Sequence, residues 1–298
     1  MSKTATWLLN HQARTYSQSG EDGIIGKILE TLPERDHWCV EFGALDGTSL
    51  SNTRNLIEHE GYSAVLIEGS NARFKELKSN YLHTEKVATV NRFVGLAVHD
   101  NLDHILAETS IPVDFDFLSI DIDGNDYHVW KASSRYAPKA VCIEFNHTIP
   151  NEVKFVQPAD PKITQGSSLS ALVDLGKAKG YELVCVEGVN AFFVKSQYFP
   201  LFDIEDNSVA TLRVDMSAIT YLFVGYDGTI FLHGQKTMPW HCKLPLRASG
   251  MQRLPKFLRK FSDSYNTFER LAFAVYLLLS SPRTLMSEIK KRHGARKI

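Results

Sequence analysis

The chain has 298 residues, of which 44% are hydrophobic and 22% are charged, a composition typical of a globular protein. Its formal net charge of −1 offers no overall basic surplus for a nucleic-acid partner. The opening segment lacks the apolar core of a secretory signal, and no stretch reaches the roughly 18 apolar residues that cross a bilayer, so we expect a cytoplasmic protein.

A helix is expected first, because Ser19 and Asp22 have the spacing of a capping box before an apolar helical face. Short apolar runs then alternate with helical patterns as far as residue 180, which predicts a doubly wound α/β domain with a mostly parallel sheet. The expected strands are 37–44, 63–69, 87–94, 115–123 and 139–146, and the expected helices are 51–60, 71–81, 101–109, 126–133 and 168–179.

Two further segments complete this domain. Residues 147–167 contain three prolines and no periodicity, which predicts a long loop of the kind that often carries function. Residues 181–199 predict a hairpin that turns at Val189 and Asn190 and adds an antiparallel edge strand. We therefore expect a domain over 1–200, with ligands bound beyond the carboxyl ends of its strands.

Residues 201–298 predict an extension made of a hairpin, turning at Asp227 and Gly228, and helical segments. Around 253–261, apolar residues share one helical face opposite basic ones, and the chain ends in KKRHGARKI. One interpretation is a packing helix with solvated charges. The other is a contact with a partner, a second copy, or the inner face of a membrane as a peripheral protein.

The first strand ends in VEFGALDGTS, which places Glu41, Gly43, Asp46 and Gly47 around a turn that a ligand can approach closely. The dinucleotide pattern GxGxxG is not met, and an acid beside a diphosphate would repel it. A cofactor that carries an ammonium and a sulfonium, as S-adenosylmethionine does, suits this loop better. Glu68, at the end of the second strand, is placed to accept both ribose hydroxyls of an adenosine.

Acidic residues gather after the fourth strand, where Asp121 and Asp123 lie on one face of the chain. The fifth strand ends beside them with Glu144, Asn146 and His147. Close carboxylates need a cation, hydrogen-bond donors or solvent between them, so this cluster suits a substrate hydroxyl, a divalent ion or a general base. His147 also has the intrinsic pKa of a base. We predict Asp121, Asp123 and His147 as catalytic residues.

Several motifs together resemble those of the FkbM-type methyltransferases, a branch of the class I S-adenosylmethionine-dependent fold. The segments that carry the resemblance are YSQSGEDGII, VEFGALDGTSLSNT, VLIEG, LSIDIDGNDYHVW and VCIEFN, within residues 16–200. The resemblance implies a seven-stranded sheet with an antiparallel last strand. It also implies that Gly43, Asp46 and Gly47 face the methionine part of the cofactor and Glu68 the ribose.

The motif DIDGND stands where the commoner family pattern has a DxxG-type motif. Catechol-type methyltransferases bind magnesium with acids and an amide after strands four and five, and Asp121, Glu144 and Asn146 are similar to that set. We therefore expect magnesium or manganese as an alternative to simple acid–base chemistry.

The expected function is methyl transfer to a hydroxyl of a sugar, glycoconjugate or related natural product, as members of this family commonly perform. Two alternatives remain. One is a nicotinamide-dependent oxidoreductase, which the incomplete glycine pattern disfavours. The other is a non-catalytic subunit of a polysaccharide assembly complex that keeps the methyltransferase fold, which the acids retained at both strand ends disfavour.

Overall fold

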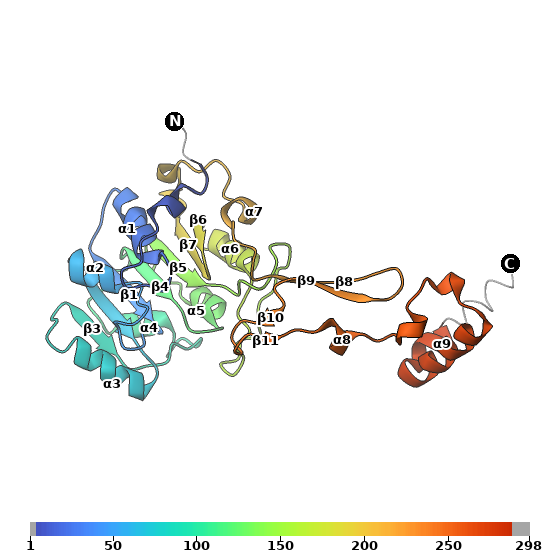
Figure 1. The fold of residues 1–298 in the computed structure, drawn as a ribbon. Coiled ribbons are helices and arrows are strands. Elements are labelled where there is room, and N and C mark those ends of the chain that lie inside the picture. The colour runs from blue at the N-terminus through green and yellow to red at the C-terminus, as the bar shows by residue number, and fades with distance from the viewer. Residues whose placement is uncertain (1–3, 288–298) are drawn as a thin grey trace. The chain divides into compact units, whose positions relative to one another are not determined.

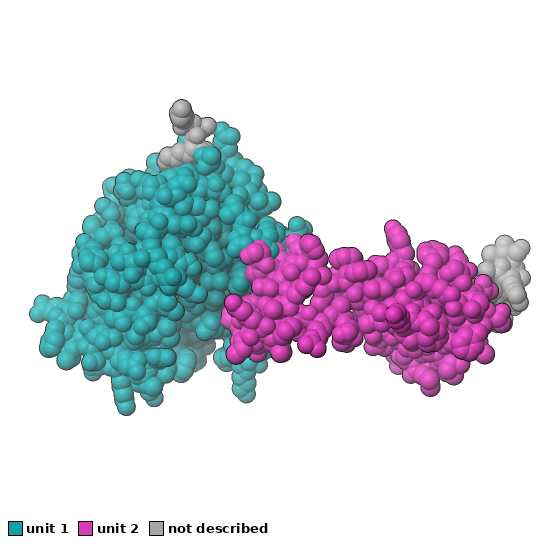
Figure 2. Space-filling view, viewed as in Figure 1, with its two compact units in different colours: residues 1–216 teal, residues 217–298 magenta. Residues whose placement is uncertain are grey.

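The computed structural model describes residues 4–287 and divides the chain into two compact units, residues 1–216 and residues 217–298 (Figure 2). The first unit extends sixteen residues beyond the expected end at residue 200. Phe202, Ile204 and Leu212 are buried in it. The side chain of Arg213 donates hydrogen bonds to the backbone of His147 and Ile149, which fastens this segment to the long loop.

A seven-stranded sheet forms the centre of the first unit (Figure 1). The strands are β1 (Trp38–Phe42), β2 (Ser63–Ile67), β3 (Val87–Val90), β4 (Phe117–Ile120), β5 (Ala140–Glu144), β6 (Tyr181–Glu187) and β7 (Asn190–Lys195). Their order is β3-β2-β1-β4-β5-β7-β6, and β7 runs antiparallel to both of its neighbours while the other pairs are parallel. This is the class I methyltransferase fold, and the expected fold class is confirmed.

Helices cover both faces of this sheet. They are α1 (Glu21–Thr31), α2 (Arg54–His59), α3 (Asn71–Asn80), α4 (Leu102–Leu106), α5 (Asp126–Ala132) and α6 (Leu169–Ala178), with η1 (Trp7–His11), η2 (Phe199–Phe202) and α7 (Val209–Leu212) around them. Helices α1, α2 and α3 pack into one apolar core, and α4, α5 and α6 pack into another. Because side chains alternate along a strand, Val40 and Phe42 enter one core while Cys39 enters the other.

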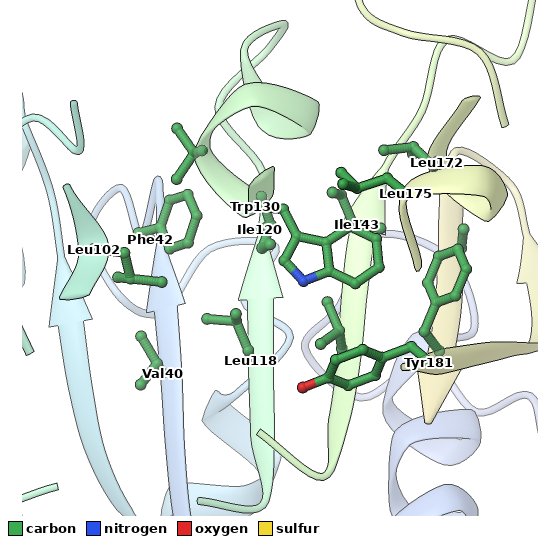
Figure 3. Packing of buried hydrophobic residues seen from close by; sticks show 14 of the residues in the cluster. Val40, Phe42, Leu102, Leu118, Ile120, Trp130, Ile143, Leu172, Leu175 and Tyr181 are labelled. Atoms are coloured by element: carbon green, nitrogen blue, oxygen red, sulfur yellow. The ribbon is translucent and has the colours of Figure 1, made fainter. Parts of the chain in front are cut away.

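Trp130 of α5 fills the centre of the core beneath α5 and α6 (Figure 3). Its ring centroid lies 5.1 Å from that of Phe193 on β7 and 5.7 Å from that of Tyr181 on β6. Aromatic pairs in tilted contact add roughly 0.5–1.5 kcal/mol to their area burial. This packing holds α5 against the sheet.

Two local predictions are corrected. The hairpin turns at Gly188 and Val189, one residue earlier than expected, and β7 enters between β5 and β6 so that β6 forms the sheet edge. The expected capping box is also absent: Gly20 caps α1, and the carboxylate of Asp22 accepts hydrogen bonds from the backbone of residues 15–17 instead.

The second unit contains the hairpin β8 (Thr220–Val224) and β9 (Ile230–Gly234), whose turn at Asp227 and Gly228 is confirmed. It continues with β10 (Thr237–Met238), β11 (Leu244–Pro245), α8 (Ala248–Met251), η3 (Lys256–Leu258), η4 (Ser262–Ser264) and α9 (Thr267–Ser280). The prediction of a helical face over 253–261 is wrong: only the short turn η3 forms there, directly after Pro255. The expected basic end, KKRHGARKI, lies outside the described residues.

Of the helices described, none is long and apolar enough to cross a membrane.

A buried ion pair stabilises the amino end of the sheet. Lys139 Nζ lies 2.6 Å from Asp116 Oδ1 and 3.3 Å from Asp36 Oδ2, and the Asp116 side chain is fully buried. Asp116 also accepts hydrogen bonds from the backbone N–H groups of Asp36 and His37. Removing only one partner of such a pair leaves an uncompensated charge in the core.

We predict that Lys139→Met lowers the free energy of unfolding by about 3–5 kcal/mol, because Asp116 loses its counter-charge. Chemical denaturation measures this change. Lys27→Met is the matched control, since the partner of Lys27 is the exposed Glu30, and the control should change stability by less than about 1 kcal/mol. Equal effects of the two substitutions would show that the buried pair is not the cause.

Candidate functional site

The backbones at the ends of β1 and β4 approach each other closely, at the point where the strand order reverses. Gly43 has a positive φ of 76°, and a Cβ atom built on it would lie 1.8 Å from the backbone oxygen of Asp121. Only glycine fits this approach. The loops that follow the two strands are therefore held side by side at the edge where doubly wound sheets bind ligands.

Glu68 connects the loop after β2 to the loop after β1. Its Oε2 accepts a hydrogen bond from Leu45 N at 2.9 Å, and its Oε1 accepts one from Ser70 N at 2.6 Å. Only 7% of the residue is exposed. Each carboxylate oxygen has a second lone pair, so the group can still accept hydrogen bonds from a ligand.

Glu41 is buried in β1, beneath the segment that leads into α2. Its carboxylate accepts hydrogen bonds from Ser51 Oγ, Asn52 N and Thr53 Oγ1 at 2.6, 2.8 and 2.7 Å. Burial raises the pKa of Glu41. With three internal donors, this side chain positions the loop rather than offering oxygen atoms to a ligand.

Asp46 and Gly47 shape the turn itself. Asp46 Oδ1 accepts hydrogen bonds from Thr48 N and Ser49 N; burial opposes ionisation, but these N–H groups hold the pKa of Asp46 at about 2. Gly47 has a φ of 74°, and its carbonyl accepts a hydrogen bond from Tyr81 Oη at 2.8 Å. Asp46 therefore stays ionised at neutral pH and adds negative charge to this loop.

Three of the predicted acids are brought together. Asp121, Asp123 and Glu144 each offer a carboxylate oxygen, and these oxygens lie within 4.8 Å of one another. Asp123 has a positive φ of 56°, an uncommon backbone conformation for a residue other than glycine. Such conformations cluster at functional sites, where surrounding structure maintains them.

Crowding changes the protonation of this cluster. Burial, and then the negative charge of Asp121, raise the pKa of Glu144 to about 9. Burial, and then the charge of Asp123, raise the pKa of Asp121, while a hydrogen bond from Glu144 lowers it. Glu144 therefore keeps its proton at neutral pH and donates a hydrogen bond to Asp121, which carries the negative charge of the pair.

Asp126 supports the cluster from the first turn of α5. Its two oxygens accept hydrogen bonds from Ile122 N and Gly124 N, both at 2.9 Å, so it fixes the backbone on either side of Asp123. The residue is buried, and burial raises its pKa to about 7 in spite of these bonds. Its role in the site is to shape the loop after β4.

Glu21 and Asn190 were missed by the sequence analysis. Asn190 lies directly opposite Glu144 in the antiparallel β5–β7 pair, where facing side chains lie about 4.5–5.5 Å apart. Its Nδ2 donates to Glu21 Oε1 at 3.1 Å, and its buried Oδ1 has no hydrogen-bond partner among the described residues. The motif YSQSGEDGII contained Glu21, but nothing local to the sequence linked it to β5.

The amide of Asn146 is bonded within the long loop, and His147 is not in the group of three acids that could hold a metal ion. Asn146 Oδ1 accepts hydrogen bonds from Thr148, and its Nδ2 donates to Gln165 O at 2.7 Å, so this amide holds the long loop together. Arg213 donates to the backbone oxygen of His147. Burial, and then the charge of Arg213, lower the pKa of His147, so its imidazole is neutral at physiological pH.

The loop 147–167 has no helix or strand, as predicted, and it packs beside the cluster. Gln157 is buried and organises it, because its Oε1 accepts hydrogen bonds from the backbone N–H groups of Gln165 and Gly166. The same oxygen lies 3.0 Å from a Cβ built on Gly124. The loop therefore forms a wall against the backbone that carries Asp123.

No family model and no curated protein sequence matches the chain. Among solved structures, it is similar to the N-terminal domain of EvdMO1 with S-adenosylhomocysteine bound, at 11% identity and a TM-score of 0.38, over 61% of this chain and 80% of that chain. A SAM-dependent methyltransferase from Aquifex aeolicus matches at 14% identity and a TM-score of 0.34, over 57% and 87%. Similarity at this level carries no argument of its own, and the fold class follows from the strand order alone.

The raised pKa of Glu144 predicts how stability depends on pH. Burial and the neighbouring acids make the folded state retain this proton up to about pH 9, whereas the unfolded state releases it near pH 4.3. Stability therefore falls as pH rises through this window, by at most about 1.4 kcal/mol per pH unit. Glu144→Gln should remove that loss. Denaturant titrations from about pH 5 to about pH 9 in a chelator measure it. A stability difference between the two proteins that does not change with pH would contradict the shared proton.

Proposed function

We propose that residues 1–216 form an S-adenosylmethionine-dependent methyltransferase of the FkbM type that methylates a hydroxyl group. The observation that carries the proposal is the convergence of Gly43, Glu68 and Asp121 at the β1/β4 reversal of a sheet with an antiparallel seventh strand. Ligands of doubly wound sheets bind at this reversal. A sugar, glycoconjugate or related natural product is the proposed acceptor.

The donor groups at the site suit this cofactor. Glu68 retains lone pairs for the ribose hydroxyls, and the missing side chain at Gly43 leaves its backbone open to close approach. The ionised Asp46 and the Asp121–Glu144 pair give the site a negative charge, which favours an ammonium and a sulfonium and repels a diphosphate. This charge is the argument against a nicotinamide dinucleotide.

S-Adenosylmethionine, when bound, supplies an electrophilic methyl group. The protein must then orient an acceptor hydroxyl and receive its proton. Asp121 is the proposed base, because it is ionised while Glu144 holds the proton of the pair, and because its raised pKa makes it a stronger base than an ordinary carboxylate. Asp123 orients the hydroxyl from the same cluster. We assign no proton transfer to His147.

A divalent ion is the alternative at this cluster. Asp121, Asp123 and Glu144 supply three carboxylate oxygens, and the amide oxygen of Asn190 supplies a fourth beside Glu144. Oxygen ligands of this kind suit magnesium or manganese. In this version Asn190 replaces Asn146 in the expected ligand set, because the Asn146 amide is bonded to the long loop.

Calorimetry with S-adenosylhomocysteine and with NAD tests the cofactor. The wild-type chain should bind only the first, and Glu68→Gln should weaken that binding about tenfold to a hundredfold, since it removes a charge-assisted acceptor. Glu76→Gln on the exposed surface of α3 is the matched control and should leave affinity unchanged. Binding of NAD alone would replace the proposal with an oxidoreductase.

Paramagnetic resonance of manganese tests the divalent ion. If the cluster binds the metal, Asp121→Asn should abolish the signal of protein-bound manganese. Asp174→Asn is the control and should leave that signal unchanged, because Asp174 pairs with Lys154 on the surface. Bound manganese that persists in the Asp121→Asn variant would indicate binding outside the cluster. If the wild-type chain binds no manganese, the acid–base version of the mechanism is retained.

A further inference from the structure

The second unit is strongly basic, although the whole chain is nearly neutral. Residues 217–298 contain 14 lysines and arginines and 4 acids, a formal charge of +10. Residues 1–216 contain 19 lysines and arginines and 30 acids, a formal charge of −11. The whole-chain charge of −1 therefore conceals two units of opposite sign, and the second has the charge of a protein that binds an anionic surface.

Helix α9 in this unit exposes an apolar stripe. Phe268, Leu271, Val275 and Leu278 follow one another at spacings of three or four residues, so they lie on one side of the helix. They are exposed by 71%, 66%, 48% and 57%. No residue of α9 is buried, and from Leu271 to Ser280 the helix has no charged side chain. Exposure of this much contiguous apolar surface marks an interaction site.

The opposite side of α9 contacts its own unit. The ring centroids of Tyr265 and Phe273 lie 5.6 Å apart, and Tyr276 Oη donates to the backbone oxygen of Arg253 at 2.8 Å. Lys260 Nζ forms an ion pair of 2.6 Å with Glu269. These contacts fix the orientation of the helix, and the stripe is the side that they leave outward.

The segment before α9 places aromatic and basic side chains together. Phe257 and Phe261 are 54% and 56% exposed, and Lys256, Arg259 and Lys260 lie between or beside them. Leu258 in the same turn is fully buried, and its carbonyl accepts a hydrogen bond from Tyr265 Oη at 2.6 Å. The segment is therefore anchored through Leu258 while its phenylalanines face outward among cations.

We propose that α9 and residues 253–261 dock the protein on an anionic membrane surface, with the helix lying in the interface. Apolar side chains enter the acyl boundary, and the surrounding lysines and arginines contact anionic headgroups. A second copy docked stripe to stripe fits less well, because it would bring two units of +10 together. A nucleic acid would pair with the positive charges but has no apolar surface that could bury the leucines and valine of the stripe.

Vesicle flotation of the full chain tests this proposal. Vesicles of phosphatidylcholine with about a third phosphatidylserine should carry the protein, whereas phosphatidylcholine alone should carry little, and salt should weaken the binding. The double substitution Leu271→Gln with Leu278→Gln should reduce binding at least about tenfold, and Lys256→Gln about fivefold. Val98→Gln in the first unit, where the side chain is 86% exposed, is the matched control and should bind normally.

Thermal unfolding and S-adenosylhomocysteine binding confirm that each variant is folded, because the substituted side chains are exposed. Three results would overturn the proposal: no flotation with anionic vesicles, equal flotation with neutral vesicles, or unchanged flotation of the leucine variant. A dimer in sedimentation, or an RNA complex in gel shift, that the leucine variant abolishes while vesicle binding persists would assign the stripe to that partner instead.

Discussion

A sheet that is covered by helices on both faces can present polar groups to a ligand only at the ends of its strands. In this protein two strand ends are held especially close together, because Gly43 lets the end of β1 lie against the backbone of Asp121. Glu68 then joins the loops after β1 and β2 by accepting a backbone hydrogen bond from each, and Asp126 fixes the loop after β4 in the same way. The position of every proposed functional group depends on this junction.

The same junction concentrates negative charge. Burial, together with the mutual repulsion of Asp121, Asp123 and Glu144 within 4.8 Å, opposes ionisation of all three unless a cation joins them. The raised pKa values of Glu144 and Asp121 are the physical result. A protein gains no stability from such an arrangement, so its persistence is best explained by a function. Accepting a proton, binding a divalent ion and attracting a cationic cofactor all use the charge that destabilises the free site.

The sequence predicted the features that depend on local patterns. Buried apolar runs located the parallel strands, and acids at the ends of those runs located Glu68 and Asp121. It failed where a contact joins distant segments: β7 entering between β5 and β6, Asn190 facing Glu144, and Glu21 reaching Asn190 across the sequence. Asn146 was assigned to the wrong surroundings for the same reason, since the loop that binds its amide has no periodicity to reveal its path.

The central claim is that S-adenosylmethionine binds at the β1/β4 reversal with its reactive end toward the acids. A crystal structure of the complex with S-adenosylhomocysteine tests it most directly. The account predicts ribose hydroxyls on Glu68, the amino acid part beside Gly43, and the sulfur facing Asp121. A ligand bound elsewhere in the chain, or one at this edge whose ribose does not contact Glu68, would contradict it.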